Sequence, residues 1–284
     1  MKSTPIFIAA CFFWLLAAPV HSEELPLEAF VKHGDYLELT ISPDGNHLAA
    51  RLRQDDTVFL VIMRRADMQV IGGAKPAPNS EVHSVTWVNN ERVVFEYAEK
   101  RPGFDAPIPT GELIAINIDN SKRKLLYGFR AGDAKTGSRI STREDTYASH
   151  EILSVLPDDE DHILIIEYPW SLEGNYYYDN RSKRSIISKL DVYSGRKKRV
   201  EILPYNGAQA LANLAGDVSY MSWRSEDSKY HAAYREDSES EWIPLDVSFS
   251  DHAPQPVAVN AASTKVYFLI PYGEREIRTM FELE

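Results

Sequence analysis

Cysteine is almost absent from this sequence of 284 residues. Cys11 is the only one, and it lies in an apolar stretch close to the N-terminus. The remainder of the chain therefore cannot form a disulfide, a thiol nucleophile or a cysteine-ligated metal site. No pair of the eight histidines has the short helical or strand spacing, with an acidic partner, that zinc ligands require. We expect these histidines to lie on the surface or in turns.

Basic residues are also fewer than acidic residues. The chain contains 31 Lys and Arg residues against 42 Asp and Glu residues, for a formal net charge of -11, and the acidic residues are scattered along it. This balance is poorly suited to binding the phosphates of nucleic acids or an anionic membrane surface. We expect no nucleic-acid partner, and membrane contact only through the N-terminal segment described next.

Residues 1–22 have the features of a secretory signal peptide. Lys2 precedes the apolar run PIFIAACFFWLLAAPV, which is too short to span a bilayer comfortably, and small residues follow before Glu23. An uncleaved anchor and lipidation at Cys11 are the alternatives. Cleavage near Ser22 would leave residues 23–284 without cysteine, and export without disulfides fits a bacterial periplasm better than a eukaryotic secretory route. The segment therefore predicts a periplasmic or secreted location.

Helical periodicity is scarce after the signal segment, and a strand–turn–strand pattern recurs in its place. The first copy is LTISPDGNHLAARL (Leu39–Leu52), in which Pro, Asp and Gly favour a tight turn between two strands. The other copies are VTWVNNERVVFEY, LSVLPDDEDHILIIEY, ALANLAGDVSYMSW and VAVNAASTKVYFLI. The matching turn positions are Pro43, Asn89, Asp158, Ala215 and Ala261, so the spacings are 46, 69, 57 and 46 residues. Propeller blades repeat at about 40–50 residues, and insertions explain the longer spacings.

A second pair of strands follows each of the first four hairpins. VFLVIMRRADMQVIGG follows the first and ELIAINIDNSKRKLLYG the second, while SIISKLDVYSGRKKRVEI follows the third and YHAAYRED with EWIPLDV the fourth. Four antiparallel strands make one blade of a propeller. The sequence thus predicts an all-β fold over residues 23–284, a β-propeller with four complete four-stranded blades and a partial fifth. A strand from HGDYLEL could complete the fifth blade, and a β-sandwich or barrel is the alternative fold.

Two stretches carry a resemblance to a known family. LPLEAFVKHGDYLELTISPDGNHLAA resembles the first part of the propeller of S9-family serine peptidases, the prolyl oligopeptidase group, and especially its bacterial dipeptidyl-aminopeptidase and acylaminoacyl-peptidase-like members. VHSVTWVNNERVVFEY resembles their second blade, with Trp87, Asn89, Asn90 and Arg92 in the expected pattern. The resemblance is good from about residue 25 to 128 and weaker beyond. The Ser-Pro-Asp-Gly turn alone also occurs in other periplasmic propellers, such as the TolB type.

The family has a seven-bladed propeller and an α/β-hydrolase domain whose serine nucleophile sits in a Gly-x-Ser-x-Gly turn. This sequence contains no Gly-x-Ser-x-Gly, so the resemblance transfers no catalytic residue to it. It implies a non-catalytic propeller region, incomplete relative to the family, that caps a hydrolase active site and gates the access of peptides. Whether the protein belongs to an enzyme stays open. A stand-alone periplasmic binding or scaffold propeller without peptidase activity is the alternative.

The most unusual loop is EYPWSLEGNYYYDNRSKR, within the long third repeat. It interleaves aromatic and basic residues, which are favoured at contact surfaces. The candidate contact patch consists of Trp170, Tyr176, Tyr177, Tyr178 and Arg181. We expect a peptide, a hydrolase domain or a partner protein to bind there. The alternative is a long hairpin that packs its aromatic side chains against itself.

No cofactor or metal site is predicted. The segment LPDDEDH (Leu156–His162) clusters four carboxylates, but it lacks the glycine that a calcium loop needs for its sharp turn. An acidic hairpin turn explains it better. Asp44, Asp158 and Asp217 occupy matching inner turns, where turn chemistry explains them better than a pair of carboxylates for glycoside hydrolysis.

Overall fold

The computed structural model describes residues 35–131, 146–248, 251–260, 264–272 and 277–283, all within a single unit, Asp35–Glu284. Regular secondary structure in this part of the chain consists of β-strands alone. None of it is a helix of the length and apolar character needed to cross a membrane. The predicted signal peptide, residues 1–22, lies outside the described residues.

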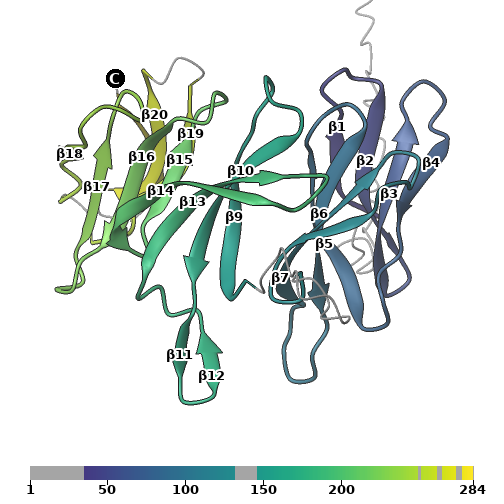
Figure 1. Ribbon diagram of the computed structural model, residues 1–284, viewed down its shortest axis with the longest axis horizontal. Helices are drawn as coiled ribbons and strands as arrows, with labels where there is room; N and C mark the ends of the chain where they lie inside the picture. Colours follow the sequence, from purple (N-terminus) through teal and green to yellow (C-terminus); the bar gives the residue numbers. More distant parts are fainter. Residues whose placement is uncertain (1–34, 132–145, 249–250, 261–263, 273–276, 284) are drawn as a thin grey trace, which may run out of the picture. The chain divides into compact units, whose positions relative to one another are not determined.

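Among the described residues the strands form five antiparallel sheets of three or four strands that follow one another along the chain, and one two-stranded ribbon (Figure 1). The first sheet contains β1 (Tyr36–Ile41), β2 (His47–Gln54), β3 (Thr57–Arg64) and β4 (Val70–Ala74), and the second contains β5 (Ser80–Trp87), β6 (Arg92–Glu99), β7 (Ile108–Asn117) and β8 (Lys124–Tyr127). The third contains β9 (Ala148–Val155), β10 (His162–Pro169), β13 (Arg184–Asp191) and β14 (Lys197–Asn206). The fourth contains β15 (Gln209–Ala212), β16 (Val218–Arg224), β17 (Tyr230–Tyr234) and β18 (Ile243–Leu245), and the fifth contains β19 (Gln255–Val259), β20 (Val266–Tyr272) and β21 (Ile277–Leu283). Each strand pairs with its neighbours in chain order, as in the blades of a propeller.

The predicted fold is confirmed, with four four-stranded blades and a three-stranded fifth among the described residues. Two details differ from the sequence-based expectation. The HGDYLEL segment does not complete the fifth sheet, because β1, which contains its Tyr36–Leu39 portion, pairs with β2 in the first sheet. The long third repeat contains an additional two-stranded ribbon, formed by β11 (Ser171–Glu173) and β12 (Tyr176–Tyr178) between β10 and β13.

The Ser-Pro-Asp-Gly turn between β1 and β2 is held by its own polar groups. The Ser42 hydroxyl donates a hydrogen bond to the Asp44 carboxylate at 2.6 Å and accepts one from the His47 amide at 2.9 Å. Gly45 has a φ of +73°, in the left-handed region that side chains disfavour. Local turn chemistry therefore fixes the register of this hairpin.

The residues that carry the family resemblance join neighbouring sheets. The Trp87 indole N–H donates to the Thr40 carbonyl of the first sheet at 3.3 Å. The Asn89 side-chain amide reaches in the other direction, to the Glu160 carbonyl at 2.9 Å, in the turn that precedes β10. These contacts give the motif a structural role in holding the second sheet between the first and the third.

Arg92 is the largest fully buried side chain of the second sheet. Its Nε donates to the Val192 carbonyl at 2.8 Å and its Nη1 to the Asn117 Oδ1 at 2.6 Å, and its Cζ lies 4.4 Å from the centre of the Tyr193 ring. The contacts with Val192 and Tyr193 are made by the segment that follows β13 in the third sheet, while Nη2 donates to the Lys122 carbonyl of the second sheet at 3.1 Å. The guanidinium fork thus connects two sheets while its polar groups remain hydrogen-bonded in the interior.

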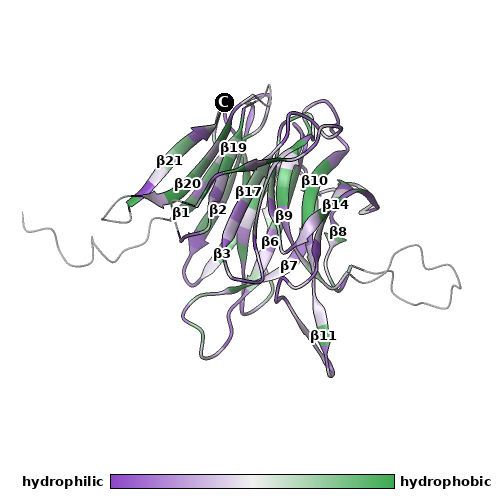
Figure 2. Ribbon diagram, turned by 90° about the vertical axis from the view of Figure 1, so that its left-hand side faces the viewer, coloured by the Kyte–Doolittle hydropathy of each residue, from purple (hydrophilic) through white to green (hydrophobic). Residues whose placement is uncertain are grey.

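In the part of the chain that the structure describes, the core consists of four apolar clusters, one between each pair of consecutive sheets. In β6, Val93 and Phe95 belong to the first cluster and Val94 to the second, because successive side chains point to opposite faces of the sheet. In β10, Ile163 and Ile165 likewise face the second sheet, while the alternate residues belong to the third cluster. Figure 2 shows the apolar residues gathered along the strands and the polar residues toward the turns. None of the four clusters joins the described residues of the first sheet to those of the fifth.

Candidate functional site

The ribbon β11–β12 extends from the third sheet, between the ends of β10 and β13 (Figure 1). Glu173 pairs with Tyr176, so Gly174 and Asn175 form a two-residue turn. Gly174 has a φ of +62°, which a type II′ hairpin turn requires at its first central position. The sequence Gly-Asn between two short runs of residues therefore explains why this insertion forms a hairpin.

The apolar side chains of this ribbon are turned toward solvent. Tyr176 is 70% exposed, Leu172 57%, Tyr178 48% and Tyr177 43%. Leu172 pairs with Tyr177, so these two side chains lie on one face of the ribbon, and Tyr176 and Tyr178 lie on the other. An isolated two-stranded hairpin has little stability of its own, so contacts at its base must hold it.

An aromatic residue that the sequence analysis did not identify supplies one of these contacts. Tyr147, which precedes β9, stacks on Tyr177 with ring centres 4.0 Å apart and planes 10° apart. The ring of Tyr147 also lies 6.5 Å from that of Trp170. Tyr147 is separated from the ribbon by a complete hairpin of the third sheet, and no motif around it signals the contact. Three aromatic rings therefore meet at the base of the ribbon, of which two were predicted as part of the patch.

Hydrogen bonds fix the base of the ribbon to β9. The Trp170 indole N–H donates to the Ser149 hydroxyl at 2.9 Å, and this hydroxyl donates to the Asp179 carboxylate at 2.5 Å. Lys183 donates from its Nζ to the Trp170 carbonyl at 2.7 Å. The segments before and after the ribbon are thus both attached to the third sheet, and the exposed tyrosines are carried on an anchored support.

Among the described residues, Arg181 makes its ion-pair and ring contacts with residues other than the predicted aromatic ones. Its guanidinium is 3.4 Å from the centre of the Tyr168 ring, 3.2 Å from Asp179 and 3.8 Å from Glu151. Burial, and then the charge of Glu151, raises the pKa of Tyr168, so its ring faces Arg181 as a neutral phenol. The predicted patch therefore divides into an aromatic ribbon and a separate arginine held by two acids and an aromatic ring.

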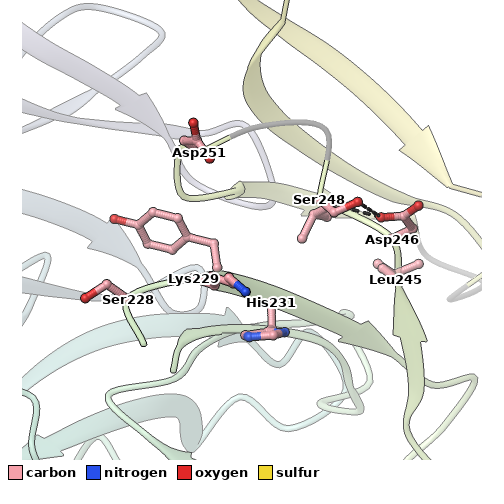
Figure 3. Close-up of a pocket in the computed structure, with 9 residues that line it drawn as sticks. Ser228, Lys229, His231, Leu245, Asp246, Ser248 and Asp251 are labelled. Carbon is pink, nitrogen blue, oxygen red and sulfur yellow. Dashed lines mark hydrogen bonds between the residues drawn. The ribbon is translucent and has the colours of Figure 1, made fainter. Parts of the chain in front are cut away.

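Two cavities lie near the fourth sheet, and Tyr230 at the start of β17 lines both. One, of about 410 Å³, includes Arg181 in its lining, and the other has a volume of about 420 Å³. Figure 3 shows the second, with Lys229 and His231 on one side and Asp246 and Ser248 on the segment that follows β18. There the Ser248 hydroxyl donates a hydrogen bond to the Asp246 carboxylate at 2.6 Å. This carboxylate therefore already has a hydrogen-bond partner within its own turn.

A buried titratable pair between the second and third sheets overturns the expectation that every histidine is a surface or turn residue. The side chain of His150 in β9 is 3% exposed, and its Nε2 lies 3.7 Å from the Glu96 carboxylate in β6. Burial lowers the pKa of His150 to about 4, although the charge of Glu167 opposes this, and burial raises the pKa of Glu96 to about 7. His150 is neutral above its pKa and Glu96 is neutral below its pKa, so both side chains are uncharged between about pH 4 and about pH 7. No motif around His150 reveals that a neighbouring sheet covers that face of β9.

Glu167 is the charged group beside this pair. It is buried at 4% exposure and receives hydrogen bonds from Lys197, Ser188 and Tyr127, the last at 3.2 Å. A buried carboxylate that is paired and hydrogen-bonded in this way is stable in the interior. Neither Glu167 nor the pair lines the two cavities described above, so we interpret these groups as structural.

Among the described residues, no group of three or more His, Cys, Asp or Glu side chains is placed to hold a metal ion. The acidic segment before β10 forms the predicted turn, in which the Asp159 amide donates to the Leu156 carbonyl at 2.8 Å. The Asp159 carboxylate accepts hydrogen bonds from Lys189 and then from His162, each at 2.7 Å, and these contacts lower its pKa. Asp159, one of the four carboxylates of the segment, is therefore paired with its neighbours.

No protein-family model matches the chain, and no curated protein matches it. Solved structures do match. An acylaminoacyl peptidase in complex with Z-Gly-Gly-Phe-chloromethyl ketone has a TM-score of 0.52 at 12% identity, covering 89% of this chain and 38% of that one. The acylaminoacyl peptidase of Pyrococcus horikoshii, in an orthorhombic crystal form, has a TM-score of 0.50 at 14% identity, with the same coverage of 89% and 38%. TolB from Acinetobacter baumannii has a TM-score of 0.45 at 12% identity, covering 86% of this chain and 51% of TolB.

The likeness to the acylaminoacyl peptidases confirms the predicted resemblance at the level of the fold. Identities of 12% and 14% carry no information on shared activity. The chain spans 38% of the length of these peptidases, so the similarity concerns one part of them. This agrees with a propeller region and with the absence of a Gly-x-Ser-x-Gly sequence.

Proposed function

We propose that this chain is the non-catalytic propeller part of an exported, S9-like serine peptidase, and that it caps a hydrolase domain and gates the access of peptides. The observation that supports this most is the shared fold with acylaminoacyl peptidase, which covers 89% of this chain but 38% of the peptidase. Those proportions are expected of a propeller without its hydrolase. In this proposal the chain has no catalytic residue, and hydrolysis depends on a serine supplied from outside residues 23–284.

The ribbon β11–β12 is the surface through which the propeller contacts the hydrolase. Contact surfaces are enriched in tyrosine, because its ring gives a large apolar area at low conformational cost while its hydroxyl remains hydrogen-bonded. Tyr176, Tyr177 and Tyr178 have these features and are exposed on a ribbon whose base is anchored. The acidic surface of the chain adds no general affinity for anionic partners, so recognition has to come from such local contacts.

Site-specific photo-crosslinking tests this proposal. A benzoylphenylalanine replaces Leu172 on the ribbon, and the cells that make the protein are irradiated and then treated with a fluorophosphonate, which labels the active-site serine of serine hydrolases. We expect a cross-linked product that carries the fluorophosphonate label. Val200 on β14 is a matched control position, because it is 49% exposed against 57% for Leu172 and lies away from the ribbon.

A labelled product from position 172 and none from position 200 is the expected result. A product from position 172 that lacks the label, or no product at all, contradicts the proposal that the ribbon contacts a hydrolase. The purified chain alone should hydrolyse no peptide and take up no fluorophosphonate, and labelling of the chain itself would contradict its non-catalytic assignment.

A stand-alone binding propeller is the second candidate function. The two cavities of about 410 and 420 Å³ favour it, because they fall in the size range of small-ligand sites, about 300–1,000 Å³. In this case the protein binds its ligand without a hydrolase. An unlabelled cross-linked product from position 172 would favour this function over the first.

Export is part of both candidate functions and rests on residues 1–22. We propose that this segment is removed near Ser22 and that the protein is released into the periplasm or secreted. N-terminal sequencing of the protein isolated from cell fractions tests this. A mature N-terminus at Glu23 is expected, and a retained residue 1 would contradict removal of the signal.

A further inference from the structure

The cavity of about 410 Å³ lies where connections of the third, fourth and fifth sheets meet. Its lining includes Arg181 after β12, Asn206 and Gln209 around the connection from β14 to β15, and Trp223, Arg224 and Tyr230 from β16 and β17. These residues come from four separate segments of the chain. The sequence analysis singled out only Arg181 among them, because residues this far apart show no common motif.

The charge of this lining differs from that of the rest of the protein. Acidic residues outnumber Lys and Arg by 42 to 31 in the chain, yet the lining holds Arg181 and Arg224 and no Asp or Glu. The lining thus holds no carboxylate that would repel a bound anion, although Arg181 is paired with two acids that lie outside the lining.

Several donors in this lining are unused. The Arg224 guanidinium donates from Nε to the Ser228 carbonyl at 3.2 Å and has no acidic partner among the described residues. The side-chain amides of Asn206 and Gln209 make no hydrogen bond within that part of the chain. Donors that lack a protein partner at a cavity wall are available to a ligand, and a guanidinium binds a carboxylate through two parallel hydrogen bonds.

The aromatic wall of the cavity is held in place. Trp223 stacks on Tyr205 with ring centres 3.8 Å apart and on His231 at 5.2 Å, so two ring contacts hold the indole. The Cζ of Arg224 lies 5.7 Å from the centre of the Tyr230 ring. A wall fixed by stacking orders few side chains when a ligand binds, which lowers the entropic cost of binding.

The backbone at Arg181 is strained. Its φ is +53°, in the left-handed region where residues other than glycine are uncommon. Gly207 packs against it so closely that a Cβ there would lie 2.6 Å from the Arg181 Cβ. Such strain persists where the surrounding structure imposes it, and it is frequent at binding sites. Because Asp179 and Glu151 already balance the charge of Arg181, Arg224 is the cation left for a ligand.

We propose that this cavity binds the carboxylate of a short peptide, with Arg224 as the group that recognises the negative charge. The side-chain amides of Asn206 and Gln209 are suited to the peptide groups that precede the carboxylate, because each amide both donates and accepts. The carboxylate part of the proposal follows from the lining itself, whereas its assignment to a peptide rests on the proposed function. The carboxylate is either the C-terminus of the peptide or an acidic side chain near it.

Calorimetric titration of the full purified chain at low ionic strength tests this proposal. The ligands are acetyl-trialanine with a free C-terminus, the same peptide with an amidated C-terminus, acetyl-Ala-Glu-Ala-amide, and succinate. We expect at least one of the two peptide acids to bind about tenfold tighter than the amidated trialanine, the difference that one charge-assisted hydrogen bond gives. Which of the two acids binds identifies the source of the carboxylate.

Variants assign the effect to Arg224. The Arg224→Gln variant should lose the preference for the acid over the amide, whereas Arg199→Gln, on the exposed strand β14 outside the cavity lining, should keep it. Arg181→Gln should reduce binding less than Arg224→Gln, because the charge of Arg181 is already paired.

Equal affinity for acid and amide, a preference that survives Arg224→Gln, or no binding of any ligand at millimolar concentration would overturn the proposal. Succinate that binds as tightly as the peptide acids would overturn the assignment to peptides. Failure of the proposed function is distinguishable, because the absence of a fluorophosphonate-labelled cross-link from position 172 leaves the preference for a carboxylate unchanged.

Discussion

Two neighbouring segments of the third sheet use similar residues in opposite ways. In β10, Ile163 to Tyr168 are almost completely buried, because the second and fourth sheets cover the two faces of the strand. The ribbon β11–β12 begins two residues after β10, and its Leu172 and three tyrosines are exposed. The difference is that, among the described residues, neighbouring sheets cover β10 and do not cover the ribbon. Residue type alone would predict similar burial for both segments.

This contrast separates stability from recognition. Fully burying an Ile side chain contributes about 1.5–3 kcal/mol, so β10 contributes to the free energy of folding through both of its faces. Exposed tyrosines contribute little of this kind, and a cluster of exposed apolar residues on a soluble protein marks a contact site. We therefore expect changes in β10 to lower stability and changes in β11–β12 to lower binding.

The largest expected effect is a loss of stability when a core residue of β10 is replaced. Replacing Ile165 with Ala removes a side chain that is 0% exposed in the cluster between the second and third sheets. Loss of its apolar contacts and the resulting cavity should reduce the free energy of unfolding by about 2–5 kcal/mol. Urea denaturation measures this quantity.

The matched change on the ribbon is Leu172→Ala, at a residue that is 57% exposed. It should change the free energy of unfolding by less than about 0.5 kcal/mol, as expected for a surface site. A loss of more than about 2 kcal/mol at Leu172, the lower end of the range for a buried large-to-small change, would contradict the division between core and ribbon.

A second prediction concerns the buried pair that lies against β10. Ordinary pKa values of 4.5 and 6.5 apply to Glu96 and His150 in the unfolded chain, against about 7 and about 4 in the folded one. The raised pKa of Glu96 makes stability fall as the pH rises from 4.5 to 7, because the folded state holds the proton more tightly. The lowered pKa of His150 makes stability rise between pH 4 and 6.5, because the unfolded state holds the proton more tightly. The two slopes oppose each other in the wild-type protein.

Single substitutions should therefore reveal slopes of opposite sign. Relative to the wild type, the Glu96→Gln variant should gain stability as the pH rises from 4.5 to 6.5, by up to about 1.4 kcal/mol per pH unit. The His150→Gln variant should lose stability over the same range. Urea denaturation at several pH values provides the measurement, and slopes of the same sign in the two variants would show that the pair does not titrate as described.

The smallest expected effect lies within the ribbon. Tyr177→Ala removes the ring that stacks on Tyr147, which should cost about 0.5–1.5 kcal/mol of stability. Tyr176→Ala, at the most exposed of the three tyrosines, should cost less than about 0.5 kcal/mol. Thermal unfolding of both variants compares them, and an equal or larger loss at Tyr176 would mean that the stack does not support the ribbon.

Much of the fold could be predicted from the sequence because each sheet is built from contacts that are close along the chain. Turn residues such as Asp44 and Gly45 mark the hairpins, and alternating or continuous apolar runs mark the strands. The Trp87–Arg92 motif pointed to the correct architecture because these residues join neighbouring sheets. A motif with a structural role identifies a fold and gives no information on a binding partner.

The site was less predictable, because its residues meet only through the packing of separate sheets. The aromatic ribbon stood out by composition, but Tyr147 joins it from a distant connection without any local signal. Arg224 is an ordinary strand-end arginine in the sequence, and its open position in a cavity depends on segments of three sheets. The burial of His150 was missed for the same reason, since the sheet that covers it comes from another repeat.

The most direct test of the division between core and ribbon combines stability and contact in one variant. Tyr176, Tyr177 and Tyr178 are replaced together by Ser, and the photo-crosslinker is placed at Leu172. The midpoint of thermal unfolding should fall by only a few degrees, since about 1 kcal/mol corresponds to about 2–4 °C in a domain of this size, while the yield of the labelled cross-link should drop at least about tenfold. An unfolding temperature lower by more than about 10 °C, or an unchanged cross-link, would contradict the assignment of the ribbon to recognition.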